Sequence, residues 1–164
     1  MRGIWVGLIA SVLSSAVVAE ERPRWHFGIG YDDLKGYRES SPLLTVDYDL
    51  GTAFSRDSLT WHLGGEAMSD GDFWIGAGLT YEYQLGNGPW FLEAEFLPGL
   101  YYREDERPGI DNLHYPMFRT KGAIGYRLKN GNEIALTLSH LSDGGFDTDA
   151  GSTESLSIRY GVSF

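Results

Sequence analysis

The stretch that decides the fold is Trp90-Phe91-Leu92-Glu93-Ala94-Glu95-Phe96. Every second residue from Trp90 onward is apolar or aromatic, whereas Glu93 and Glu95 lie between these residues. Because successive side chains of a β-strand point to opposite faces, this period of two predicts a strand with one apolar face and one charged face.

The same alternation recurs along the chain, and each repeat is bounded by residues typical of turns. The other segments cover residues 25–31, 44–50, 59–63, 73–83, 118–128, 134–138 and 156–164. Together with the opening stretch they make eight, an even number like that of single-chain bacterial outer-membrane barrels. The pattern therefore predicts an all-β fold of eight strands.

Charge placement indicates which face points inward. A soluble barrel packs its apolar face inside, whereas a membrane barrel turns it toward lipid and encloses its polar side chains. The sixth segment carries Arg119, Lys121 and Arg127 beside the strand of Glu93 and Glu95, so these charges can neutralise one another in a narrow lumen. This favours an eight-stranded antiparallel up-and-down transmembrane β-barrel with a filled lumen. Composition alone leaves a soluble sandwich or lipocalin-like barrel equally open.

The N-terminal residues are typical of a cleavable signal peptide. Arg2 is followed by an apolar run over 4–13 and by small residues that end at Ala19. We expect a signal peptide over 1–19 and one outer-membrane barrel domain over 20–164. No apolar run reaches the roughly 20 residues that a membrane-spanning helix needs.

Composition restricts the chemistry and the partners. The chain has no cysteine, which excludes disulfides, cysteine nucleophiles and thiolate metal sites. Its net charge of −10 makes nucleic acid an unsuitable partner, because phosphate backbones attract basic surfaces. The 22 glycines and 10 tyrosines suit a closed barrel with aromatic girdles.

The connections alternate between short and long. Residues 84–89 and 129–132 are compact and rich in Gly and Asn, as periplasmic turns require. Residues 32–41, 103–114 and 143–153 are longer and more charged, so we expect them on the cell exterior. The aromatic C-terminal residue Phe164 resembles the last-strand signal of outer-membrane proteins, which implies barrel-assembly machinery as a partner during insertion.

Three histidines could suggest a zinc site. His26, His62 and His114 are dispersed over three segments, and two of them share the inward face with acidic residues. This favours hydrogen-bonding groups of the lumen over metal ligands, and we expect neither a metal nor a cofactor.

The alternation breaks at one place. His140, Ser142 and Glu154 occupy positions of the last two segments where lipid-facing apolar residues are expected. Polar groups there cost roughly 1 to 4 kcal/mol depending on depth, so the cluster is a functional candidate. The alternative is that the three are ordinary residues of the membrane interface at the barrel rim.

These residue types can form a nucleophilic site. Residues two apart on a strand share a face, so the His140 imidazole can act as general base on the Ser142 hydroxyl. Glu154, from the neighbouring strand, can accept the other ring N–H and stabilise the imidazolium.

The run His140-Leu141-Ser142-Asp143-Gly144-Gly145, with Glu154 twelve residues after the serine, resembles the signature of the lipid A 3-O-deacylase (PagL) family. That signature is His-x-Ser-Asn-x-Gly on the seventh strand of an eight-stranded outer-membrane barrel, with a glutamate on the eighth. The strong similarity covers residues 134–164. One position differs, because Asp143 stands where the family has asparagine.

The resemblance implies a serine esterase that removes the 3-O-linked hydroxyacyl chain of lipid A in the Gram-negative outer membrane. Ser142 would be the nucleophile, His140 the base and Glu154 the orienting acid, with the backbone at Asp143 and Gly145 as oxyanion hole. The implied partners are lipopolysaccharide and outer-membrane lipids, and a homodimer is left open. The alternative function is a non-catalytic barrel, either an adhesin or a structural protein.

Overall fold

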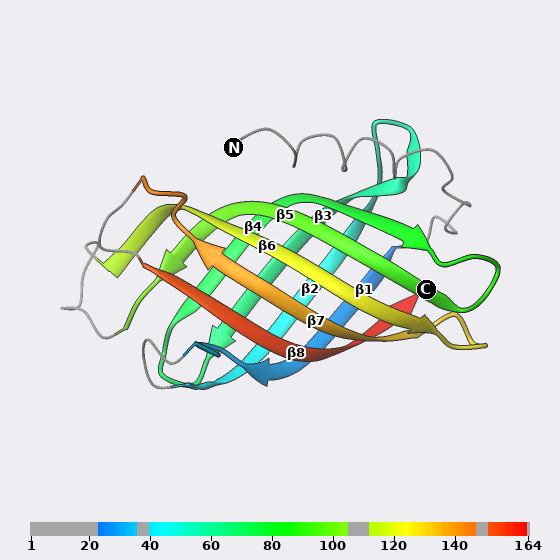
Figure 1. The fold of residues 1–164 in the computed structure, drawn as a ribbon. Helices are drawn as coiled ribbons and strands as arrows, with labels where there is room; N and C mark the ends of the chain where they lie inside the picture. The colour runs from blue at the N-terminus through cyan, green and yellow to red at the C-terminus, as the bar shows by residue number, and fades with distance from the viewer. Residues whose placement is uncertain (1–22, 36–39, 105–111, 147–150, 164) are drawn as a thin grey trace, which may run out of the picture.

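The computed structural model describes residues 23–35, 40–104, 112–146 and 151–163, which form one closed β-barrel (Figure 1). Each strand pairs antiparallel with the next, and the last pairs with the first. The strands are β1 (Arg24–Tyr31), β2 (Pro42–Ala53), β3 (Arg56–Met68), β4 (Phe73–Gln84), β5 (Trp90–Tyr102), β6 (Leu113–Arg127), β7 (Glu133–Ser142) and β8 (Ser152–Ser163). The predicted eight-stranded up-and-down barrel is confirmed. The expected signal peptide and Phe164 lie outside the described residues.

Several strands extend beyond the alternating segments. β3 continues to Met68, which pairs with Leu43, although the apolar alternation stops at Leu63. Gly64 and Gly65 interrupt the side-chain pattern there but not the backbone pairing. β6 ends at Arg127, one residue short of the prediction.

The outer wall of the barrel is apolar. Ile29, Leu44 and Ile158 lie side by side on the wall and are 68%, 60% and 59% exposed. The charged residues Arg119 and Arg159 are buried inside. A continuous apolar surface of this extent requires lipid, which excludes the soluble alternative. Among the described residues, no helix is long and apolar enough to cross a membrane.

A network of ion pairs fills the middle of the lumen. Arg119 donates hydrogen bonds to Glu95, Glu66 and Asp47 at 2.7, 3.0 and 2.8 Å. The ammonium of Lys121 lies 2.7 Å from Asp47 and 2.6 Å from Glu95. The predicted neutralisation of Glu95 by β6 is therefore present.

The direct partner of Glu93 is not on β6, although β6 was expected to neutralise it. Glu93 accepts two hydrogen bonds, at 2.6 and 2.7 Å, from Arg159 of β8 on the other side of the lumen. Arg127 pairs with Glu82 of β4 at 2.8 Å. An eight-stranded barrel is narrow enough for long side chains to span it, so a charged residue need not find its partner on the adjacent strand.

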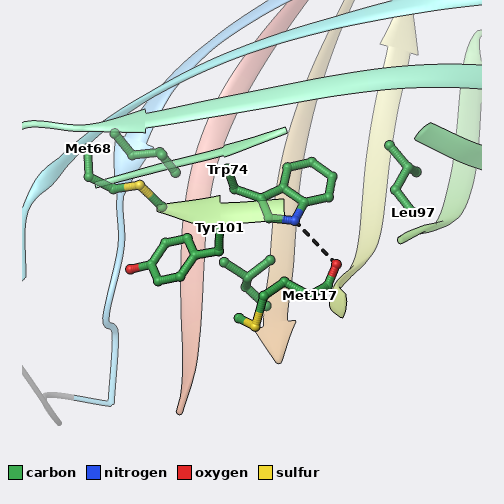
Figure 2. Close-up of a cluster of buried hydrophobic side chains, with 7 residues drawn as sticks. Met68, Trp74, Leu97, Tyr101 and Met117 are labelled. Atoms are coloured by element: carbon green, nitrogen blue, oxygen red, sulfur yellow. Dashed lines mark hydrogen bonds between the residues drawn. The ribbon is translucent and has the colours of Figure 1, made fainter. Parts of the chain in front are cut away.

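A cluster of apolar side chains fills the lumen at the exterior end (Figure 2). Its members come from strand positions near that rim: Leu43, Met68, Trp74, Leu97, Tyr101, Met117 and Leu141. The indole of Trp74 donates to the Met117 carbonyl at 3.4 Å, and the guanidinium of Arg119 lies 4.5 Å from the Trp74 ring centre. The alternation did not predict this cluster, since it assigned only polar residues to the lumen.

The periplasmic turns are as short as predicted. Phe54 and Ser55 join β2 to β3, and their φ angles of 52° and 55° are those of a type I′ turn. Gly86 and Gly131 have φ of 63° and 86° in the two turns expected to need left-handed backbone. The connections at this end of the barrel are short, and the longer loops lie at the exterior end.

Candidate active site

The pairing of β7 with β8 brings the predicted site residues together. His140 lies directly opposite Glu154, and Ser142 lies opposite Ser152. Even-numbered residues of both strands point outward, because their odd-numbered neighbours are buried in the lumen. All three candidate side chains therefore lie on the outer wall, at the end of the barrel where β7 finishes and β8 begins (Figure 1).

The imidazole and the carboxylate are in contact. His140 Nδ1 lies 3.1 Å from Glu154 Oε1, with 43% of the histidine side chain and 12% of the glutamate side chain exposed. When Nδ1 carries the proton that it donates to the carboxylate, Nε2 keeps its lone pair. This is the tautomer that a general base requires.

Ser142 lies beside this pair on the same strand face. Its α-carbon is about 6.5 Å from that of His140, given the rise of a β-strand. Both residues line an open hollow of about 420 Å³, together with Asp143, Gly145 and Ser152. Within the described residues, His140 is hydrogen-bonded to Glu154 but no hydrogen bond joins the Ser142 hydroxyl to the imidazole.

The turn after β7 forms the rim of this hollow. Gly144 and Gly145 have φ of 66° and 85°, values at which a residue with a β-carbon is strained. The N–H of Gly145 donates to Asp143 Oδ1 at 3.0 Å. The backbone donor at Gly145, one of the two expected oxyanion-hole positions, is thus occupied by the Asp143 side chain.

An aromatic group borders the serine on the other side. Phe118 of β6 lies directly opposite Ser142. Its ring is stacked with Phe96 at 5.6 Å between centroids and contacts Phe146 at 6.1 Å. The alternation places Phe118 on the lipid face but does not link it to the site, although its position toward the exterior end of β6 is a usable signal.

The connection between β1 and β2 also reaches the site. The ammonium of Lys35 forms an ion pair with the same Oε1 that contacts His140. The N–H of Leu34 donates to the backbone carbonyl of Glu154 at 2.9 Å. Sequence reasoning missed Lys35, since only the closure of β8 onto β1 brings this connection beside Glu154.

The histidines of the lumen are separate from this site. His26 and His62 both hydrogen-bond to Asp49, at 3.0 and 2.7 Å, and both are buried. Asp47, His62 and Glu95 bring potential metal-binding atoms within 4.8 Å of one another. The Lys121 ammonium already lies between the two carboxylates, so this cluster belongs to the ionic network of the lumen.

The comparison with protein families is decisive. The family model described as "Lipid A 3-O-deacylase (PagL)" matches residues 20–163. The chain belongs to the PagL family of lipid A 3-O-deacylases. Membership places it among hydrolases that act on lipid A. No curated protein sequence matches the chain.

Solved structures similar to this PagL family member show the same barrel. The outer membrane enzyme PagL superposes with a TM-score of 0.63 at 18% identity, covering 86% of this chain and 99% of that one. Neisserial surface protein A gives 0.63 at 12% identity, covering 89% and 98%. A de novo designed transmembrane β-barrel gives 0.50 at 13% identity, covering 86% and 95%. The protein is an outer-membrane barrel.

Proposed function

We propose that this protein hydrolyses the 3-O-linked hydroxyacyl ester of lipid A, with Ser142 as nucleophile, His140 as general base and Glu154 as the carboxylate that orients the base. The observation that carries the proposal is the hydrogen-bonded pair of His140 and Glu154 on the outer wall, next to Ser142. Polar side chains on a lipid-facing surface cost free energy, so a paired base and acid there call for a function.

The chemistry follows from the pairing. His140 removes the hydroxyl proton through Nε2 while Ser142 Oγ attacks the ester carbonyl, and Glu154 stabilises the imidazolium that forms. Collapse of the tetrahedral intermediate breaks the bond to the sugar oxygen, which takes the proton from the imidazolium. Water then attacks the acyl-enzyme, with His140 again as base, and releases the hydroxy fatty acid.

The developing oxyanion needs hydrogen-bond donors. We assign this role to the backbone at Asp143 and Gly145, which line the same hollow as Ser142. The Gly145 N–H points to the Asp143 carboxylate in the substrate-free protein. For this donor to serve the oxyanion, the Asp143 side chain must rotate away from it.

The surroundings suit an ester anchored in a membrane. Leu138 and Leu156 face each other directly below the His140–Glu154 pair, and both are exposed on the outer wall. An acyl chain can therefore continue from the reacting carbonyl down an apolar surface. The open hollow above the pair supplies the route for water.

Mass spectrometry of lipid A tests the proposal. The barrel, folded in detergent, is incubated with lipid A beside the variants Ser142→Ala and Ser139→Ala. Ser139 is a matched control, because it lies on the same strand but faces the lumen, 2.6 Å from the Ser155 hydroxyl. We expect loss of one hydroxyacyl mass with the unaltered protein and S139A, and a rate at least about 10³-fold lower with S142A.

The alternative of a non-catalytic barrel predicts a different result. Unchanged lipid A with the unaltered protein, or equal deacylation by S142A, would overturn the proposal. The heat-dependent gel mobility of all three proteins verifies that each barrel is folded.

A further inference from the structure

The first exterior connection is fastened to the beginning of β8. The N–H of Asp33 donates to Thr153 Oγ1 at 3.0 Å, and the N–H of Leu34 donates to the Glu154 carbonyl at 2.9 Å. Asp33 is only 1% exposed, so this contact is shielded from water. The backbone that precedes Lys35 is therefore held at the residue that pairs with His140.

The base of the same connection is closed by a second set of bonds. Asp32 Oδ1 accepts the Ser41 N–H at 2.7 Å and the Ser41 hydroxyl at 2.9 Å. The Asp32 N–H in turn donates to the Ser41 carbonyl at 3.1 Å. Both limbs are thus fixed where they leave β1 and enter β2, which limits the positions available to Lys35.

The two carboxylate oxygens of Glu154 differ in their surroundings. Oε1 contacts both His140 Nδ1 and the Lys35 ammonium. Among the described residues, Oε2 is buried and has no hydrogen-bond partner. The cation and the imidazole therefore share one oxygen, and each changes how strongly that oxygen attracts the other.

We propose that Lys35 is a positioning residue of the esterase site, whose ammonium holds the Glu154 carboxylate in place and offsets the attraction of that carboxylate for the His140 proton. The inference rests on the proposed function. An imidazole paired with an isolated carboxylate holds its proton more tightly, whereas a cation on the same oxygen offsets that attraction.

The other groups around His140 are acidic or uncharged, so Lys35 is the cation that counteracts the acidic ones. Glu154 faces it from β8, and Asp143, in the turn that follows β7, lines the same hollow. The residues of β6 that share its face are Phe118 and Thr120, which carry no charge. Both acidic neighbours favour the protonated imidazole, and Lys35 opposes them.

The test compares variants that separate charge from shape. Lys35→Met removes the charge and keeps the length, Lys35→Arg keeps the charge, and Lys129→Met removes a lysine from the turn at the opposite end of the barrel. In K35M we expect the acid limb of the kcat/KM profile for lipid A to move up by about half a pH unit, a modest shift because the lysine is half exposed. K35R and K129M should keep the unaltered profile. Salt at about 0.5 M should shrink the difference.

A second measurement does not depend on activity. NMR titration of the His140 C2–H in the isotopically labelled barrel, assigned with His140→Asn, should show the same upward shift of the titration midpoint in K35M. Identical midpoints in K35M and the unaltered protein would overturn the inference, even if K35M were less active. An inactive unaltered barrel whose midpoint still moves in K35M would instead overturn the proposed function and leave the electrostatic role of Lys35 standing.

Discussion

Asp143 accepts the backbone N–H of Gly145 through Oδ1 at 3.0 Å, in the turn that directly follows Ser142. The family signature that this run resembles has asparagine at this position, so the bond places a carboxylate where the signature has a neutral amide. A negative charge near a developing oxyanion raises the barrier that donors there would lower. If the proposed oxyanion hole forms here, Asp143 should slow the reaction, and a single mutation can test this.

The variant Asp143→Asn should deacylate lipid A faster, by about tenfold in kcat, since about 1.4 kcal/mol less repulsion in the transition state corresponds to that factor. The amide oxygen can still accept the Gly145 N–H, so the turn should keep its shape. Steady-state rates from mass spectrometry measure the effect. A kcat equal to or below that of the unaltered enzyme would show that the Asp143 charge does not act on the transition state.

Replacing Glu154 by Gln should lower kcat by a factor of about 10² to 10⁴ with little change in KM. The amide cannot stabilise the imidazolium, and it can hold His140 in the wrong tautomer. Ser139→Ala, a change on β7 that faces the lumen and lies away from the site, serves as control and should retain its rate. If E154Q kept more than half of the activity, the role of the carboxylate would be refuted.

Truncating Arg119 should destabilise the barrel. Arg119→Leu removes the cation that Asp47, Glu66 and Glu95 share and leaves only Lys121 beside Asp47 and Glu95. Breaking a buried ion pair typically costs about 3–5 kcal/mol. Urea unfolding of the barrel in lipid, followed by tryptophan fluorescence, measures the change. Arg56→Leu, at an exposed position of β3, should leave the midpoint unchanged, and a similar midpoint in both variants would contradict the prediction.

A charged residue introduced on the outer wall should destabilise the barrel more, the deeper it lies in the bilayer. Ile158→Arg places a guanidinium near the middle of the wall, where it should cost about 2–4 kcal/mol of folding free energy. Leu85→Arg, in the periplasmic turn between β4 and β5, should cost less than about 1 kcal/mol. Equal losses in lipid vesicles would mean that Ile158 does not face hydrocarbon.

Much of the fold was predictable from the sequence, because alternation with a period of two distinguishes side chains that face lipid from those that face the lumen. The same argument located the candidate site, since His140, Ser142 and Glu154 stand out only against a regular apolar face. The strand ends were less accurate where glycine removed the side-chain signal, as at Gly64 and Gly65.

Relationships across the lumen or between loops could not be read from alternation. Glu93 pairs with Arg159 rather than with β6, because the match depends on the reach of side chains inside the closed barrel. Lys35 meets Glu154 only after β1 and β8 close the barrel. Both contacts join segments that are far apart in the sequence, and the alternation within a strand gives no information about such pairs.

The packed interior, with Trp74 and its apolar neighbours above the ion pairs of Arg119, leaves the centre of the cylinder unusable as a passage. In the proposed reaction, lipid A therefore approaches by lateral diffusion in the outer leaflet, and the freed fatty acid departs the same way. Water has to arrive from the cell exterior. The proposed reaction then takes place on the outer wall where β7 and β8 meet both lipid and water. The filled lumen holds these two strands, and with them the site residues, in fixed positions.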